Sequence, residues 1–431
     1  MTRRAGVGAW VVAALVGAAL PACDDAAASA AEDEPPRRER AATSTSERDA
    51  LPPGLDEETA RRLSQLGYGD WSDDGVDARN QASGVVRHDR LATAGGRWLL
   101  TAADRCQGRL LSPEGHVLHT WDLPDDFAES NGAVFPAADE AAVFVMYNHL
   151  RLEKRDWRGD LVWSVEQPVH HDVWEGADGS LAVLVEQMRE FDLGIEGGPV
   201  PIMDNGVARI SRDGELQDVV WFGELFLDRI EARKIKRMRR RVAEDPSLLE
   251  KHGTSVLDRF HSNGVVLLEH DVPGFGERGQ ALVSIRNISV LAVIDLDAHR
   301  LVWEWGPGEL DNQHHPSLLP DGRLLIFDNG RDRGWSRLVE LDPVSRTILW
   351  EQRELEGRPF HTPIRGSAQR LPNGNTAIIV SNSGRVTEAT PDGRIAWEWL
   401  HPDVNAETGA RHVIYRVPWL PAPWPPMPGD E

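Results

Sequence analysis

The sequence predicts an all-β fold, a β-propeller of six blades with a helical insertion between the third and fourth blades. Two observations support this prediction: a tryptophan-closed repeat, and short apolar segments separated by turn dipeptides. Six of the apolar segments end in a tryptophan, at Trp121, Trp163, Trp221, Trp303, Trp350 and Trp397. The last two gaps between these tryptophans are 47 residues each, which is close to the length of one four-stranded blade.

The segments between the tryptophans alternate short strands with turns. Three of them share a strand, a turn that contains glycine and a second strand: residues 172–187, 317–330 and 368–384. Turn dipeptides such as Asp-Gly and Asn-Gly between apolar runs are typical of antiparallel hairpins. We therefore expect the six units to form one propeller domain over residues 85–420, followed by a short tail of residues 421–431.

One gap in the repeat is too long for a blade. It spans 82 residues, from Trp221 to Trp303, and includes residues 225–258, where the apolar side chains have a helical spacing. Without these 34 residues the gap matches the later blades, so we interpret them as a helical insertion. The insertion carries a basic run over 229–241, which is either a solvated helix face, a cap over one end of the propeller or a contact with anionic headgroups.

The N-terminus predicts export. A basic start followed by an apolar run that ends at Leu20 is typical of a signal peptide, here residues 1–22, and the run is short for a transmembrane helix. The letters LPAC at positions 20–23 resemble a bacterial lipobox, which implies that Cys23 carries a lipid and anchors the protein to the membrane. The next residue, Asp24, favours the inner membrane, so we expect the protein on the periplasmic side of the cell envelope. An ordinary cleaved signal peptide is the alternative.

The chain after the signal peptide has a distinctive composition and charge. Residues 23–84 are rich in Ala, Pro, Ser and charged residues, which predicts a disordered tether. The net charge of −22 excludes nucleic acid as a partner, because a phosphate backbone requires clustered Lys and Arg. We interpret the acidity as a solvated surface. The other cysteine, Cys106, has no partner once Cys23 is lipidated, so no disulfide is expected.

Histidines fall where the third, fourth and fifth blades begin. The pairs His170-His171 and His314-His315 open blades three and five, and His261 opens blade four. Loops at the starts of blades converge on one end of the central channel of a propeller. The second histidine of the first pair and the first of the other pair each stand eight residues before a turn glycine. Equivalent positions on different blades would bring these side chains together.

Arg286, on the strand after His261, adds a cation to this group. Two interpretations are open: a metal site, because histidine is the commonest transition-metal ligand, or an anion site with a nucleophile. The arginine disfavours the metal, because a fixed cation beside a metal ion costs energy unless an anion lies between them. A hydrogen-bonded structural role is the alternative for any single histidine. We expect no metal and no cofactor.

The same residues carry a resemblance to a known family. The segments are HSN (261–263), LVWEWG (301–306), QHHPSLLPDGRLLIFDNG (313–330), GSAQRLPNGNT (366–376) and GRVTEATPDGRIAWEW (384–399). Together they resemble the bacterial aryl-sulfate sulfotransferases, which are six-bladed propellers of the periplasm. The resemblance covers blades four to six well, blade three partly and the earlier blades only in their strand and turn pattern.

The resemblance implies a role for each candidate side chain. In that family the histidine after the glutamine attacks the sulfur of an aryl sulfate, which implies His314 as the nucleophile, with His315 as the alternative. His261 and Arg286 are implied as further catalytic residues. The remaining catalytic and substrate-binding residues that it implies are His171, with His170 as the alternative, Asn263 and Thr362.

We therefore expect a nucleotide-independent sulfotransferase that moves a sulfuryl group from an aryl sulfate ester to a phenol through a sulfo-histidine. A neutral imidazole can carry the group covalently, and a second imidazole, that of His171 or His261, would move the proton of the phenol. The alternative is a non-catalytic propeller lipoprotein that acts as an envelope binding or assembly module. A quinone-cofactor dehydrogenase is disfavoured, because the sequence lacks an obvious metal-and-carboxylate site.

Two departures from that family concern regions outside the blades. Well-known members dimerise through an N-terminal β-domain, whereas residues 24–84 are too polar and too few for one. Some members have a disulfide near the catalytic loop, which cysteines at positions 23 and 106 cannot supply. The oligomeric state and the shape of the acceptor pocket therefore stay open.

Overall fold

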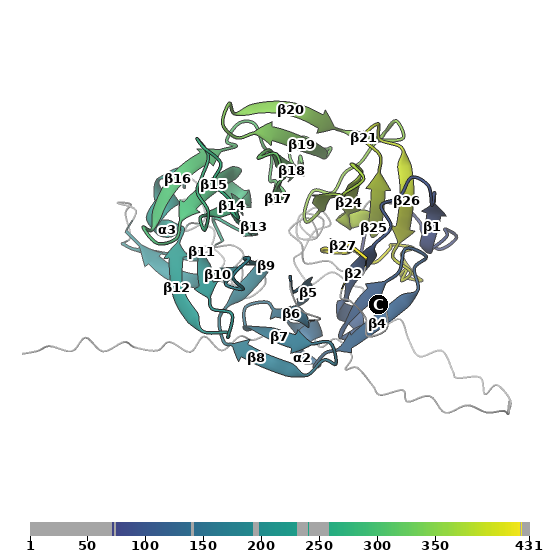
Figure 1. Cartoon of the computed structure of the whole chain (residues 1–431), viewed down its shortest axis with the longest axis horizontal. Helices are drawn as coiled ribbons and strands as arrows, with labels where there is room; N and C mark the ends of the chain where they lie inside the picture. Colours follow the sequence, from purple (N-terminus) through teal and green to yellow (C-terminus); the bar gives the residue numbers. More distant parts are fainter. Residues whose placement is uncertain are drawn as a thin grey trace, which may run out of the picture. The chain divides into compact units, whose positions relative to one another are not determined.

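The computed structural model describes residues 71–72, 75–138, 142–192, 198–230, 240, 258–422 and 424. Within them the chain forms six antiparallel sheets that follow one another around a ring (Figure 1). One edge strand of each sheet lies toward the centre and the other edge lies at the rim. The fold is the six-bladed β-propeller that the sequence predicts. The predicted signal peptide, Cys23 and most of the predicted tether lie outside the described residues.

The first three blades contain the strands β2 to β12, together with β27. Blade 1 consists of β27 (Trp419–Leu420), β2 (Arg97–Ala102), β3 (Gln107–Leu111) and β4 (Val117–Asp122). Blade 2 consists of β5 (Ala133–Pro136), β6 (Ala142–Tyr147), β7 (Arg151–Asp156) and β8 (Leu161–Val165). Blade 3 consists of β9 (Val169–Glu175), β10 (Leu181–Phe191), β11 (Val200–Ile210) and β12 (Leu216–Trp221).

The last three blades contain the remaining sheet strands. Blade 4 consists of β13 (Ser262–Leu267), β14 (Ala281–Ile285), β15 (Val290–Asp295) and β16 (Arg300–Trp305). Blade 5 consists of β17 (His314–Leu318), β18 (Leu324–Asp328), β19 (Arg337–Asp342) and β20 (Thr347–Gln352). Blade 6 consists of β23 (Ser367–Arg370), β24 (Thr376–Val380), β25 (Arg385–Ala389), β26 (Ile395–Leu400) and β1 (Gly84–His88). A hairpin of β21 (Glu354–Leu355) and β22 (Arg358–Pro359) separates blades 5 and 6.

Both ends of the described chain close the ring. Near the C-terminus, β27 is the innermost strand of blade 1, where Trp419 pairs with Trp98. Near the N-terminus, β1 pairs with β26 at the outer edge of blade 6 and gives that sheet a fifth strand. The first strand of the described chain therefore belongs to the last blade and its last strand to the first blade, each joined to its sheet by backbone hydrogen bonds.

The repeated tryptophans lie on the outermost strand of the four that each blade shares, and four of them bond to the next blade. Trp121 Nε1 donates to the carbonyl of Asp156 in blade 2 at 3.1 Å, and Trp397 Nε1 of blade 6 donates to Pro113 of blade 1 at 2.6 Å. Trp163 and Trp303 make the same contact. Each acceptor lies at the end of the third strand of the next blade or in the turn that follows that strand. The repeat therefore has a packing cause, because a buried indole needs an acceptor for its N–H group.

The apolar core is divided into six clusters, one between each pair of adjacent blades. Between blades 3 and 4, for example, Leu184 and Val207 pack in the same cluster as Val283 and Ala292. The turns between strands depend on glycine where the backbone is left-handed, as at Gly322 with a φ of 84°. Packing of this kind fixes the start of each inner strand relative to the next.

The described helices are short and lie in connections. They are η2 (Ala103–Arg105), α2 (Asp126–Glu129), α3 (Gly223–Phe226), η3 (Leu227–Arg229), η5 (Arg286–Ile288) and η6 (Ser381–Ser383). None of the helices within the described ranges is long and apolar enough to cross a membrane. The predicted insertion over 225–258 begins in the helical turns α3 and η3, and most of it lies outside the described residues. Its helical character beyond these turns stays a prediction.

The predicted C-terminal tail of residues 421–431 has one described side chain in the core. Trp424 is buried in the cluster between blades 1 and 2, where its carbonyl accepts Arg97 at 2.8 Å. The residues after it lie outside the described part of the chain.

Candidate active site

The inner strands β9, β13 and β17 each contain a bulge, and the predicted histidines lie at these bulges. The pairing register shifts at these points between the inner strand and its neighbour in all three blades. His171, His261 and His315 lie at or beside the bulges with left-handed φ values of 63°, 49° and 41°. Histidine adopts this conformation more readily than most residues, and such strained positions gather at functional sites. The bulges therefore aim side chains that a regular strand would point elsewhere.

The structure brings His171 of blade 3 and His261 of blade 4 into direct contact. Their Nε2 atoms lie 3.0 Å apart, and the rings meet edge to face. Burial lowers the pKa of His171 well below its usual range, and the neighbouring His261 lowers it further. His171 is therefore a neutral imidazole at physiological pH.

His314 is held by hydrogen bonds on both ring nitrogens. Its Nδ1 lies 2.7 Å from Asn329 Oδ1 and 3.1 Å from the carbonyl of Asn312, and its Nε2 accepts the backbone N–H of Arg365 at 3.1 Å. Since both partners of Nδ1 are acceptors, the ring proton is on Nδ1 and the lone pair is on Nε2. Burial, and after it the charge of Arg286, lowers the pKa of His314 well below its usual value. The ring is neutral and its tautomer is fixed.

Asn329 is the residue that organises the surroundings of His314. Its Oδ1 accepts from the histidine, and its Nδ2 donates to the carbonyls of Thr362 at 2.8 Å and Arg365 at 2.6 Å. In the sequence Asn329 stands only as one letter of a motif, and no role was predicted for it. Its signal was its position directly after the buried strand β18, at the same end of blade 5 as His314.

Arg286 and Asn263 lie beside this group in blade 4. Arg286 is buried and follows β14 as the first residue of η5, so the expectation that it lies on the strand is corrected by one position. The strand ends there because the backbone turns, and the N–H of Arg286 donates to the carbonyl of His261 at 3.2 Å. Asn263 donates through Nδ2 to the carbonyl of Gln313 at 2.9 Å, which links blades 4 and 5.

Thr362 lies in the loop before blade 6. Its Oγ1 donates to the carbonyl of Ile364 or to Asn382 Oδ1, both at 2.9 Å, and its own carbonyl accepts Asn329. The structure thus connects Thr362 to His314 through Asn329, and its hydroxyl is bonded within the loop.

The other two predicted histidines face different neighbours. His170 is buried with its Nε2 3.4 Å from Ser262 Oγ, and burial lowers its pKa to about 4. His315 donates through Nδ1 to the carbonyl of Ala368 at 3.1 Å. Burial lowers the pKa of His315 well below its usual value, and the charge of Arg416 lowers it further. His171 and His314 therefore belong, with His261, to the central histidine group. Their neighbours His170 and His315 instead contact other blades.

Asp258 is a second residue that the sequence did not point to. It is buried, its Oδ1 accepts the N–H of His261 at 2.8 Å, and its Oδ2 is hydrogen-bonded to Nδ1 of the same ring. Although burial raises the pKa of Asp258, the charge and hydrogen bond of His261 hold it below its usual value. The residue ends the predicted insertion, so its sequence context gave only the weak signal of an aspartate three positions before a histidine.

The segment before β27 supports the group from the C-terminal side. Tyr415 donates its hydroxyl to the carbonyl of His171 at 3.0 Å. Arg416 forms an ion pair with the buried Asp172, whose Oδ2 also accepts the N–H of Val265 at 2.8 Å. The strand that carries His171 is thereby fixed to blade 4 and to the C-terminal segment.

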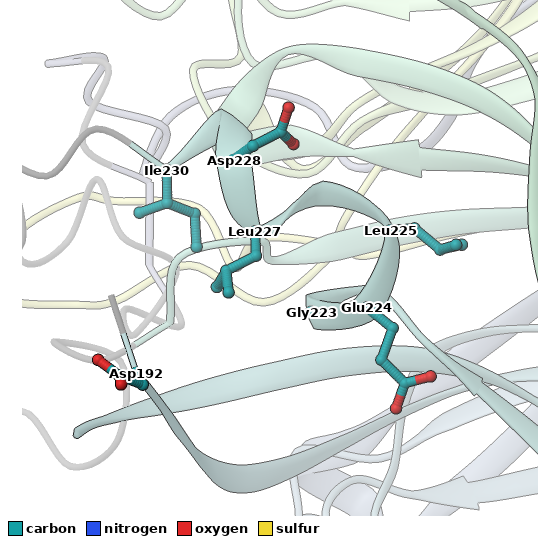
Figure 2. Close-up of a pocket in the computed structure, with 7 residues that line it drawn as sticks. All are labelled: Asp192, Gly223, Glu224, Leu225, Leu227, Asp228 and Ile230. Carbon is teal, nitrogen blue, oxygen red and sulfur yellow. The ribbon is translucent and has the colours of Figure 1, made fainter. Parts of the chain in front are cut away.

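Two further observations delimit the site. Within the described residues no group of three or more His, Cys, Asp or Glu side chains is arranged to hold a metal ion. A surface pocket at the start of the predicted insertion is lined by Asp192, Gly223, Glu224, Leu225, Leu227, Asp228 and Ile230 (Figure 2). None of these residues belongs to the histidine group, so we assign the pocket to the insertion.

The fold and the histidine group define a propeller with a polar site built from the starts of its inner strands. Comparison with protein families gives the class of protein more closely: the arylsulfotransferase (ASST) family model matches residues 138–402. The match covers more than half of the chain, and the protein belongs to this family. Family membership supports arylsulfotransferase activity in general and implies aryl sulfates and phenols as substrates.

Several solved structures are similar to this chain at low sequence identity. A protein of unknown function from Bacteroides caccae is 12% identical, with 71% of this chain and 93% of that chain covered and a TM-score of 0.45. Hydrazine synthase of Kuenenia stuttgartiensis is 12% identical, with 74% and 80% covered and a TM-score of 0.41. A streptogramin B lyase is 11% identical, with 75% and 84% covered and a TM-score of 0.40. These similarities carry nothing about activity. No curated protein matches the chain.

Proposed function

We propose that this protein transfers a sulfuryl group from an aryl sulfate ester to a phenol through a covalent sulfo-histidine on His314, without a nucleotide donor. The observation that carries the proposal is the state of His314: a neutral ring with its proton fixed on Nδ1 and a lone pair on Nε2. A neutral imidazole with an oriented lone pair is the form that attacks an electrophile.

The hydrogen bond from the backbone N–H of Arg365 to Nε2 of His314 also takes part in the proposed reaction. Attack on sulfur requires that the Arg365 N–H leaves the Nε2 lone pair. The N–H then lies next to the atom that receives the sulfuryl group, where it can donate to a sulfuryl oxygen. Backbone N–H groups that donate to developing negative charge stabilise transition states in this way.

Arg286 supplies the positive charge that a sulfuryl group requires. It lies close enough to His314 for its charge to lower the pKa of that ring. Sulfuryl transfer resembles phosphoryl transfer, where catalysis rests on positioning and on charges that face the equatorial oxygens. We assign Arg286 as the donor to these sulfuryl oxygens. We assign Asn263 to the orientation of the sulfuryl group.

The contacting pair His171 and His261 is assigned to proton transfer. Phenolate is a poor leaving group unless it gains a proton, and the incoming phenol must lose one. The two rings share a hydrogen bond between their Nε2 atoms, so the pair can release and accept a proton without a cofactor.

A colourimetric assay tests the proposal. The protein is given 4-nitrophenyl sulfate with and without phenol, and no nucleotide is added. We expect nitrophenolate release that phenol accelerates, with phenyl sulfate as the second product. The absence of phenyl sulfate would support the other function considered, a non-catalytic propeller lipoprotein that acts as an envelope binding or assembly module.

We also propose that Cys23 carries a lipid that anchors the protein on the periplasmic side of the envelope, at the inner membrane. The support is the lipobox-like sequence at positions 20–23 and the aspartate directly after it. Cys23→Ser is expected to move the protein from the membrane fraction to the soluble fraction. A substituted protein that stays with the membrane would contradict the anchor, and sodium carbonate washing controls for loose association.

A further inference from the structure

Asp258, His261 and His171 form a chain of hydrogen bonds from a buried carboxylate into the histidine group. One oxygen of Asp258 accepts the backbone N–H of His261 and the other is bonded to Nδ1 of the same ring. A carboxylate oxygen only accepts, so Nδ1 of His261 carries a hydrogen. The Nε2 atom of His261 is therefore the one that faces His171, at 3.0 Å.

The contact between the two Nε2 atoms requires one hydrogen between them. Two imidazole nitrogens form a hydrogen bond when one carries the proton and the other supplies a lone pair. The pKa of His171 lies far below its usual range because the ring is buried beside other histidines, so His171 does not hold an additional proton. The carboxylate of Asp258 is hydrogen-bonded to the ring of His261 and not to that of His171. This bond distinguishes the two rings of the pair.

No other carboxylate in the described part of the chain has this relation to the pair. Glu186 is buried, but its oxygens lie 2.7 Å from Nδ1 of His149 and 3.8 Å from Nδ1 of His170. Among the described residues Asp258 is the one carboxylate hydrogen-bonded to either ring of the pair. It also fixes the orientation of His261, whose backbone has a φ of 49°.

We propose that Asp258 is a positioning residue that makes His261, rather than His171, the proton donor to the leaving phenolate and the proton acceptor for the incoming phenol. The proposal rests on the proposed function of the site and adds which imidazole moves the proton and what holds it there. Asp258 itself touches neither substrate nor sulfuryl group.

Atoms and charges balance across the two half-reactions. In the first half-reaction a bond forms between Nε2 of His314 and sulfur, and the bond between sulfur and the aryl oxygen breaks. The electron pair goes to the aryl oxygen, which takes the Nε2 proton of His261. In the second half-reaction the acceptor oxygen bonds to sulfur, the bond between sulfur and Nε2 of His314 breaks, and the phenol proton returns to His261. His261 gives up one proton in the first half-reaction and regains one in the second, and Asp258 stays hydrogen-bonded to its Nδ1.

The experiment compares two donors in wild type and Asp258→Asn. Phenyl sulfate releases a strongly basic phenolate that needs a proton, whereas 4-nitrophenyl sulfate releases a weakly basic one that leaves without help. Release of the first product is measured in a single turnover without acceptor. Asp258→Asn is expected to lower the rate with phenyl sulfate about 100-fold or more, because general acid catalysis contributes on that order. The rate with 4-nitrophenyl sulfate should change little.

Two further variants complete the experiment. Asp218→Asn removes the carboxylate of a surface pair, where Asp218 Oδ2 lies 2.6 Å from His299 Nε2, and should leave both rates unchanged. Should Asp258→Asn not fold, Asp258→Glu keeps the charge with displaced oxygens and should show the same difference between donors in a milder form. Equal losses with both donors would overturn the role of Asp258, because a merely structural residue has no leaving-group preference. A wild-type protein that releases product from neither donor would overturn the proposed function instead.

Discussion

His314 and His315 are neighbours on β17, yet the charge of a different arginine acts on each, and each is bonded to a different blade. His314 is bonded to Asn329 within blade 5, and the charge of Arg286 from blade 4 acts on it. His315 is bonded to a carbonyl of blade 6, and the charge of Arg416 acts on it. Both rings are neutral, so their charge state does not distinguish them.

The difference between the two histidines lies in what their nitrogens face. The bulge in β17 and the left-handed backbone at His315 send the two side chains to different partners. Nε2 of His314 accepts a backbone N–H from the loop before blade 6, whereas Nδ1 of His315 is bonded to the inner strand of blade 6. Adjacent residues of one motif therefore have a chemical role and a structural role, and the tertiary partner decides which.

The largest effect is expected when the imidazole rings of His314 and His315 are removed in turn. His314→Ala should lower sulfuryl transfer by at least about 10⁴-fold, as loss of a covalent nucleophile does in other enzymes. His315→Ala should keep measurable turnover and lose about 1 kcal/mol of stability with the bond to Ala368. Steady-state rates with 4-nitrophenyl sulfate and phenol measure the first effect, and denaturant unfolding measures the second. Exchanged outcomes would make His315 the carrier.

The two arginines give a second, smaller test. Arg286→Lys keeps the charge but loses the planar fork that reaches two oxygens, so kcat should fall roughly 10²–10³-fold with less effect on substrate binding. Arg416→Lys loosens the ion pair with Asp172 and should lower the melting temperature while kcat stays close to wild type. Kinetics and a thermal melt on the same preparations separate the two. A stable Arg286→Lys variant with unchanged kcat would contradict its assigned role.

The histidine pair of blade 3 gives a third test, which uses the pH dependence of the free energy of unfolding. His170 is buried with a pKa of about 4, whereas an unfolded chain has a histidine pKa of about 6.5. Between these two pH values the folded protein therefore binds fewer protons than the unfolded chain. The contribution of His170 to the free energy of unfolding is fully present above pH 6.5 and is lost as the pH falls toward 4. The contribution is about 3 kcal/mol. His170→Asn should show a smaller loss of unfolding free energy between pH 7 and pH 5 than wild type. Parallel curves for both proteins would contradict this role.

The number of blades and the positions of the histidines could be predicted from the sequence because both repeat. A tryptophan closes each blade, and the indoles of four of the six bond to the next blade, so the same packing contact recurs at one place in the repeat and is visible in the sequence. The eight-residue spacing of His171 and His314 before a turn glycine likewise repeats in the sequence, although the left-handed backbone of His171 recurs at His315 and not at His314.

Asn329 and Asp258 could not be predicted in the same way. Their roles depend on contacts that cross loops: Asn329 joins β18 to the loop before blade 6, and Asp258 reaches His261 from the end of the predicted insertion. Neither position repeats in other blades, so periodicity gave no signal. The pairing of β1 with blade 6 was not predicted either, because it joins segments at opposite ends of the propeller sequence.

The most direct test of the central claim is to trap the covalent intermediate. Wild-type protein is mixed with 4-nitrophenyl sulfate without acceptor, quenched at alkaline pH, digested and analysed by mass spectrometry. The account predicts one SO₃ group on the peptide that contains Gln313 to Pro316, located on His314 and removed by added phenol. A label on His315, on another peptide or on none would contradict it.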